Sequence, residues 1–358
     1  KEGCPLTGGQ PSFTNRGNCD ILNQFRIPYA PQARLGDSIF SKEVSMKKII
    51  LAFLLLALLL PAVGCAAQEE KERVTVVATT YPIYLFARAV TDGTEGVVVE
   101  RLDTGSASCL HDYTLSMADM KKLERADLIA LNGAGLEDFL SDALATSDAE
   151  VVDCSAGAEL LENLSHDHKE GDEDHDHGHY DPHYWMDPAS VPTMLDNLVE
   201  GLVQIMPEWE PLLRTNTGLA ADLVERELLD TYQGRDGGGL THRELITFHD
   251  GFQYFARAFD LELLAAIEEE AGSEASAKEI VEISQLVREH DIPAIFTEVN
   301  GSDATANAIG RETGCQVWML DMLMSGDDVP QDWGLEKIME QYISRLKGDL
   351  ETVREALG

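Results

Sequence analysis

The stretch Val74-Thr-Val-Val-Ala-Thr-Thr80-Tyr-Pro-Ile-Tyr-Leu-Phe-Ala-Arg-Ala-Val-Thr91 decides the fold class. Its first half is rich in β-branched residues, which favours a buried strand, and Ile83–Thr91 is predicted to be a helix. Further strands are predicted at 97–102, 127–132 and 150–153, with a helix over 117–126. Strands that alternate with helices at this spacing predict a parallel sheet covered by helices on both faces.

Two long helices in succession interrupt this alternation. The first is predicted over 187–206, with Asp187 as its cap and Pro188 in its first turn, and the second over 207–232. The glycine-rich run 234–239 ends the second helix. Because no strand separates them, we interpret residues 188–239 as a helical connector between two lobes.

The alternation then resumes to the end of the chain. Strands are predicted at 244–249, 261–267, 294–298 and 316–320, and helices at 251–259, 276–290, 304–313 and 335–355. We therefore predict an α/β protein with two lobes, residues 74–187 and 240–358, each a mostly parallel sheet flanked by helices. We see no internal repeat in the sequence, although the lobes could share a shape.

Residues 46–64 have the pattern of an export signal. Lys47 and Lys48 precede an apolar run that is too short to be a comfortable permanent membrane helix. The stretch Ala62-Val63-Gly64-Cys65 resembles a bacterial lipobox, which implies acyl chains on Cys65 and an anchor at the outer face of the cytoplasmic membrane. Plain secretion is the alternative. We interpret 1–45 as a spurious extension and 65–73 as a tether.

The net charge and the cysteine count limit the kinds of partner and of disulfide that we expect. The net charge of −37 disfavours nucleic acid, and the chain is expected to be a monomer. Beyond Cys65 there are three cysteines, Cys109, Cys154 and Cys315, which form neither a disulfide framework nor a Cys-x-x-Cys site. Export permits one disulfide, and Cys109–Cys154 is the pair we expect if one forms.

Five histidines and six acidic residues share a run without apolar residues, within residues 165–180. The histidines are His166, His168, His175, His177 and His179. Imidazole and carboxylate suit zinc and its neighbours in the first transition row. We predict a loop that collects a divalent metal at low affinity. The alternative is a solvated acidic linker that happens to contain histidine.

Four further candidate ligands follow predicted strands or the acidic run. They are His111, His183, His249 and Asp321. In parallel α/β sheets ligands bind beyond the carboxyl ends of the strands, so these side chains are expected to meet in the cleft between the lobes. Three neutral imidazoles and one carboxylate form a tetrahedral shell that zinc accepts.

Five stretches of the chain are typical of a known family: Val77-Ala-Thr-Thr-Tyr-Pro-Ile83, His111-Asp-Tyr113, Asp181-Pro-His-Tyr-Trp-Met-Asp-Pro188, His249-Asp-Gly-Phe-Gln-Tyr-Phe-Ala256 and Gly314-Cys-Gln-Val-Trp-Met-Leu-Asp321. From about residue 74 to the C-terminus, the chain resembles the zinc/manganese substrate-binding lipoproteins of bacterial ABC transporters. The resemblance implies two lobes joined by a long rigid helix, a metal between them, and delivery to a permease driven by an ATPase. Carried over by position, the ligands are again His111, His183, His249 and Asp321.

The resemblance also bears on the choice of metal. Manganese members usually have a carboxylate at the third ligand position, whereas this chain has His249, which favours Zn²⁺. Cys109 is a departure from the family pattern, and it either tunes the His111 loop, pairs with Cys154 or contacts the metal. Glu298 ends a strand and is expected to orient a histidine without touching the metal, or else to be a solvated edge carboxylate.

Three rival functions differ in what they require. A manganese or iron receptor of the same fold is the main alternative to a zinc receptor. A zinc hydrolase needs an open coordination position and a general base, and the chain has no His-Glu-x-x-His helix, so we expect no enzyme. A surface adhesin, the third alternative, has no support in the sequence beyond display at the surface.

Overall fold

The computed structural model describes residues 73–103, 113–163, 179–229, 240–268, 276–299 and 303–358. The predicted export signal and Cys65 lie outside these residues. Within the described ranges no helix is both long and apolar enough to cross a membrane.

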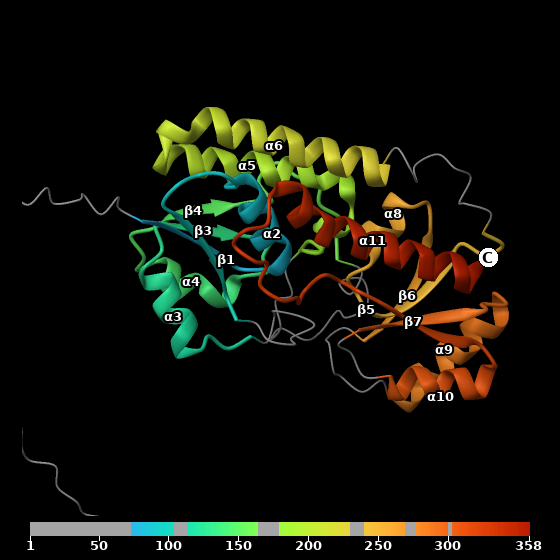
Figure 1. Cartoon of the computed structure of the whole chain (residues 1–358). Helices are drawn as coiled ribbons and strands as arrows, with labels where there is room; N and C mark the ends of the chain where they lie inside the picture. The colour runs from blue at the N-terminus through green and yellow to red at the C-terminus, as the bar shows by residue number, and fades with distance from the viewer. Residues whose placement is uncertain (1–72, 104–112, 164–178, 230–239, 269–275, 300–302) are drawn as a thin grey trace, which may run out of the picture. The chain divides into compact units, whose positions relative to one another are not determined.

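The first lobe contains a sheet of four parallel strands (Figure 1). In spatial order these are β2 (Val97–Arg101), β1 (Val74–Ala78), β3 (Leu128–Leu131) and β4 (Glu150–Asp153). Val77 and Ile129 share a hydrophobic cluster with residues of the helices α3 (Met117–Glu124) and α4 (Ser141–Leu144) and of their flanking turns. Val76, on the opposite face, belongs to the larger core. Both faces are therefore covered, as the sequence predicted.

Helix α2 (Tyr81–Val90) is the central helix of this lobe. Thr80 caps its N-terminus and Pro82 lies in its first turn, and every residue of the helix is buried. It contacts β1 and β2 on one side and the helices α5 (Val191–Ile205), α6 (Glu210–Val224) and α11 (Leu335–Leu357) on the others. Apart from Arg88 its residues are apolar or aromatic, and a helix of this composition must be enclosed to be stable.

The second lobe repeats the strand order of the first. Its four parallel strands are, in spatial order, β6 (Glu262–Glu268), β5 (Glu244–His249), β7 (Ala294–Glu298) and β8 (Gln316–Leu320). The helices α9 (Ala277–Glu289) and α10 (Ala304–Thr313) pack together, and α8 (Gln253–Ala258) contacts β6. The predicted two-lobe α/β architecture is confirmed, and the two sheets share one topology.

The predicted connector is a pair of packed helices. Figure 1 shows α5 and α6 side by side along the first lobe, where α5 contacts β3 and β4. Gly201 permits this approach, because a Cβ there would lie 2.1 Å from the side chain of Val152. Helix α6 continues into a π-helical turn over Glu225–Leu229. The lobe boundaries at 187 and 240 stay a prediction.

The last helix joins the two lobes. Helix α11 contacts α2 and α6 of the first half of the chain and β8 of the second (Figure 1). One hydrophobic cluster accordingly contains side chains of both sheets, among them Val76 and Phe296, together with Tyr342 of α11. The hydroxyl of Tyr342 donates a hydrogen bond to the carbonyl oxygen of Trp185 at 2.7 Å. Helix α11 thus fixes the segment that carries His183.

Candidate metal site

Two of the predicted ligands meet in the structure. His249 is the last residue of β5, and His183 precedes a 3-10 turn over Tyr184–Met186. Their Nε2 atoms lie 3.3 Å apart, with the rings perpendicular and their centroids separated by 5.1 Å. Both side chains are almost fully buried. Residues 66 positions apart in the sequence therefore present the same ring atom to one point.

This separation has a chemical meaning. Zinc binds imidazole nitrogen at about 2.0–2.1 Å, and two ligands of a tetrahedral ion are then about 3.3 Å apart. The distance between the Nε2 atoms of His183 and His249 matches this value. The pair fits one edge of a tetrahedral zinc shell.

Asp181 orients the first of these rings. Its Oδ1 atom accepts a hydrogen bond from the backbone N–H of His183 at 2.9 Å and lies 2.7 Å from His183 Nδ1. Because an ionised carboxylate can only accept, Nδ1 carries the proton and Nε2 keeps its lone pair for a metal. Asp181 is not among the site residues predicted from the sequence. The available signal was a carboxylate two residues before the candidate histidine in Asp181-Pro-His183.

Helix α8 of the second lobe holds Asp181 in place. Gln253 Nε2 donates to Asp181 Oδ2 at 3.1 Å, and the hydroxyl of Tyr254 donates to the Asp181 carbonyl oxygen at 2.8 Å. Six residues further along the segment, Asp187 is bound by Arg257 with an Nη2–Oδ2 distance of 2.8 Å. The position of His183 therefore depends on contacts between the two halves of the chain.

Glu298 lies beside the second ring. Its Oε1 atom is 3.6 Å from His249 Nδ1, and both side chains are buried. This is the ring nitrogen that faces away from His183, so the placement agrees with the orienting role expected for Glu298, which stays a prediction. Gly251 lies close to both rings, because a Cβ there would be 2.9 Å from His249 Cδ2 and 3.2 Å from His183 Cδ2.

Asp321 hydrogen-bonds to residues other than the two histidines. Its Oδ1 atom accepts from the backbone N–H of Leu323 at 2.9 Å, and its Oδ2 atom lies 3.2 Å from Arg345 Nη1. Within the described ranges no three histidine, cysteine, aspartate or glutamate side chains converge closely enough to hold a metal. His111 and Cys109 lie outside the described residues. The ligand roles of His111 and Asp321 therefore stay predictions.

The base of the histidine-rich run is a short antiparallel pairing. Glu162 pairs with Tyr180, and the backbone N–H of Asp181 donates to the carbonyl oxygen of Leu161 at 2.9 Å. His179 is exposed, with its Nε2 atom 3.9 Å from Glu162 Oε1. The other four histidines of the run, His166, His168, His175 and His177, lie outside the described residues.

The expected Cys109–Cys154 disulfide is wrong. Cys154 carries a free thiol, and its side chain is completely buried within the larger hydrophobic cluster. Burial raises the pKa of this thiol far above its ordinary value, so it stays protonated and unreactive. Cys154 is a core residue.

Glu137, another buried carboxylate, supports the segment of His183 from the first lobe. It accepts hydrogen bonds from the Thr79 hydroxyl and the backbone N–H groups of Asn132 and Gly133. Burial raises the pKa of Glu137 to about 7, although these donors favour its charged form. Asn132 in turn donates to the carbonyl oxygen of Pro182 at 3.0 Å. Glu137, which follows the glycine-rich turn after β3, is not among the residues predicted from the sequence.

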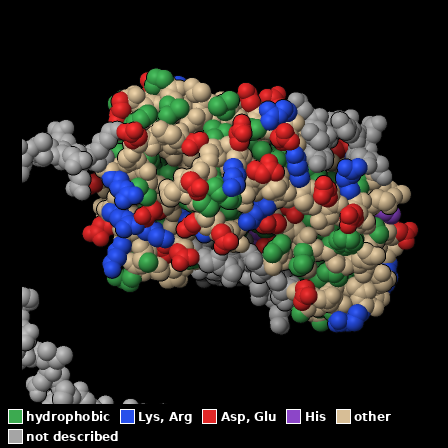
Figure 2. All heavy atoms as spheres, in the orientation of Figure 1, with side chains coloured by type: hydrophobic (Ala, Val, Ile, Leu, Met, Phe, Trp, Pro, Cys, Tyr) green, Lys and Arg blue, Asp and Glu red, His purple; other side chains and the backbone are tan. Residues whose placement is uncertain are grey.

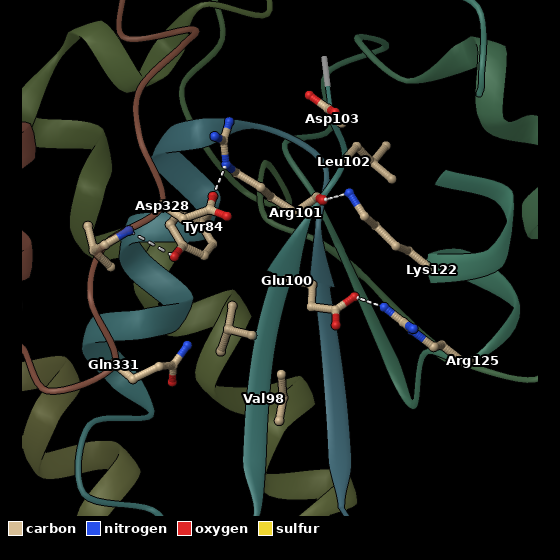
Figure 3. Close-up of a pocket in the computed structure, with 12 residues that line it drawn as sticks. Tyr84, Val98, Glu100, Arg101, Leu102, Asp103, Lys122, Arg125, Asp328 and Gln331 are labelled. Atoms are coloured by element: carbon tan, nitrogen blue, oxygen red, sulfur yellow. Dashed lines mark hydrogen bonds and ion pairs between the residues drawn. The ribbon is translucent and has the colours of Figure 1, made fainter. Parts of the chain in front are cut away.

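A cavity of about 430 Å³ lies at the outer edge of β2 and has a different character. Figure 3 shows its charged residues paired with one another: Arg101 with Asp328, and Arg125 with Glu100. Figure 2 shows lysine and arginine side chains gathered over the first lobe near α3. Among the described residues, no histidine or cysteine lines this cavity.

The sequence of the chain resembles those of known proteins. The family described as ZnuA, zinc-uptake complex component A periplasmic, matches residues 76–356. The zinc-binding lipoprotein AdcA of Streptococcus pneumoniae (strain TIGR4) is 27% identical over 316 residues, which cover 87% of this chain but only 61% of AdcA. The high-affinity zinc uptake system protein ZnuA of Bacillus subtilis (strain 168) is 24% identical over 82% of this chain and 90% of its own length.

Solved structures share the fold. A crystal structure of ZnuA superposes with a TM-score of 0.66 at 24% identity, covering 80% of this chain and all of that one. The laminin-binding adhesin Lmb of Streptococcus agalactiae superposes with a TM-score of 0.64, also at 24% identity and the same coverage. The family match spans most of the chain. The chain therefore belongs to the family of zinc-uptake complex component A.

Proposed function

We propose that the chain is an extracytoplasmic receptor that captures Zn²⁺ and delivers it to an ABC permease and its ATPase. The observation that carries this is the buried pair of Nε2 atoms of His183 and His249 at 3.3 Å, the spacing of two zinc ligands. The zinc is cargo that must be released, so we propose a binding protein and not an enzyme. Curated relatives named for zinc support the same choice.

We propose that His111 and Asp321 complete the shell around this pair. Imidazole is a better ligand for zinc than for manganese, which prefers oxygen donors. A shell of three histidines therefore selects zinc. Manganese is disfavoured as cargo on this ground, although one neighbour of the same fold, at 21% identity, is described as Mn-bound.

The orienting carboxylates give the site its affinity. Asp181 fixes the tautomer and the orientation of the His183 ring before metal binds. Metal binding therefore loses less free energy to ordering of the ring. We propose that Glu298 acts in the same way on His249, which it approaches within 3.6 Å. The site is thus shaped before the metal arrives.

The setting of the receptor is also part of the proposal. We propose that Cys65 carries the lipid anchor and that the protein acts as a monomer at the outer face of the cytoplasmic membrane. The histidine-rich run, His166 to His179, would collect zinc at low affinity beside the tight site. Its base, at Glu162 and Tyr180, joins directly to the segment of His183.

The test uses residues 66–358, one compact unit, stripped with chelator and titrated with Zn²⁺ and Mn²⁺ by calorimetry. We expect one tight zinc site that His183→Ala abolishes, with manganese much weaker. Tight manganese binding would show that the reading of His249 is wrong. If zinc binds only weakly and at several sites, the proposed four-ligand site between the lobes would have to be abandoned.

The role of the histidine-rich run needs its own variant. Deletion of residues 164–178 leaves the base of the run and His183 in place. We expect the tight site to survive this deletion and the weak sites to disappear. Loss of the tight site would show that tight zinc binding depends on the histidine-rich run and not on the site of His183 and His249 alone.

A further inference from the structure

Arg345 of α11 binds the carboxylate that the zinc shell would require. Its Nη1 atom lies 3.2 Å from Asp321 Oδ2, while Asp321 Oδ1 accepts from the N–H of Leu323. Both carboxylate oxygens thus have partners inside the protein. Asp321 can therefore offer a metal only its remaining lone pairs, and the Arg345 guanidinium draws the negative charge of the carboxylate away from that metal.

The guanidinium is itself held firmly. Arg345 donates to the carbonyl oxygen of Ser325 at 2.6 Å and stacks over the ring of Tyr81 at 5.1 Å. One turn further along α11, Asp349 Oδ1 accepts from the backbone N–H of Asp321 at 2.9 Å. Helix α11 therefore binds both the backbone and the side chain of Asp321. Arg345 also contacts Tyr81 of the first lobe.

We propose that Arg345 determines the metal specificity of the site by competing with the metal for Asp321. While Arg345 holds this carboxylate, the shell is dominated by imidazole. That favours zinc, and it penalises manganese, which depends more on oxygen ligands. The inference rests on the proposed function and names a residue that would set its selectivity.

The expected change in metal affinity follows from the solvent exposure of Arg345 and Asp321. The side chains of Arg345 and Asp321 are 26% and 29% exposed, so solvent screens their attraction. Arg345→Gln should strengthen manganese binding about fivefold, the effect of removing a partly exposed ion pair. Zinc binding should change less, so the ratio of the manganese dissociation constant to the zinc dissociation constant should decrease. Arg345→Lys, which keeps the charge, should preserve the ratio of the parent chain.

Arg101 provides a matched control. It stacks over the same Tyr81 ring at 5.3 Å and donates to the Gly326 carbonyl oxygen in the same turn, but its partner is Asp328 and not Asp321. Arg101→Gln removes the same charge from the same ring and turn. We expect it to leave the ratio of manganese to zinc affinity unchanged.

The experiment is a calorimetric titration of the full chain and these variants with Zn²⁺ and Mn²⁺, with melting curves to verify folding. In an Asp321→Asn background, Arg345→Gln should have no effect on either metal. The inference is overturned if Arg345→Gln leaves the ratio unchanged, if Arg101→Gln alters it equally, or if the gain persists without the Asp321 carboxylate. Failure of the proposed function would appear separately, as the absence of tight zinc binding in the parent chain.

Discussion

Replacing Asp181 by asparagine tests whether the site is shaped in advance. The side chain is 1% exposed, and its Oδ1 atom serves both the backbone N–H and the Nδ1 of His183. Asparagine keeps the shape but removes the charge that fixes the tautomer. Loss of such an orienting partner typically weakens metal binding 10–100-fold. We therefore expect the zinc dissociation constant to rise by about tenfold or more.

The assay is competition with a chromophoric zinc chelator at neutral pH, and Asp187→Asn is the matched control. Asp187 is also buried and charged and lies in the same segment, but it caps the following turn and binds Arg257 without touching a histidine. Both variants lose a charge-assisted hydrogen bond, worth about 1.5–3 kcal/mol of stability. Asp181→Asn should weaken zinc binding much more than Asp187→Asn, because only Asp181 bonds to a histidine ring. Equal losses in the two variants, or none in Asp181→Asn, would refute the reasoning.

Three further predictions concern the neighbourhood of this pair. Zinc affinity should fall as the pH is lowered, because protons compete with zinc for the imidazole nitrogens; a zinc affinity that does not change with pH would contradict an imidazole shell. Burial raises the pKa of Glu137 to about 7, so its contribution to stability is lost as the pH rises through that value. In urea unfolding, the parent chain should therefore lose stability relative to Glu137→Gln as the pH rises from about 4.5 to about 7, and parallel pH profiles would contradict this. Gly251→Ala should weaken zinc binding and lower stability by about 1–3 kcal/mol, since its Cβ would press on His249 and Met322. Gly218→Ala, which meets no atom within 4 Å, is its control in chelator competition and melting, and equal effects of the two would contradict the steric argument.

The order of strands and helices was readable from the sequence because it depends on local patterns. The strands at 150–153, 244–249, 294–298 and 316–320 end where the structure ends them. Their β-branched and apolar runs are bounded by polar or glycine-containing turns, and both faces of each sheet need covering. The alternation alone therefore indicated two parallel sheets, and the consecutive helices indicated where the first gives way to the second.

Part of the site could be predicted for a similar reason. His249 ends β5, and the carboxyl ends of parallel strands gather on one edge of a sheet, so its general location followed from the fold. The sequence did not show that His183 would lie 3.3 Å from it, since that distance depends on how the two lobes pack. The Cys109–Cys154 prediction failed because spacing does not reveal whether a thiol faces the core.

The sequence by itself determined the fold class, the two lobes and the chemistry of the candidate ligands, because these follow from residue type and from periodicity over a few turns. Tertiary structure alone decided which groups support or restrain the ligands: Asp181 held by Gln253, Glu137 tied to Asn132, and Asp321 bound by Arg345. A buried carboxylate must find a donor wherever the packed chain offers one. The partner is often far away in the sequence, as Gln253 is from Asp181, and no local pattern identifies it.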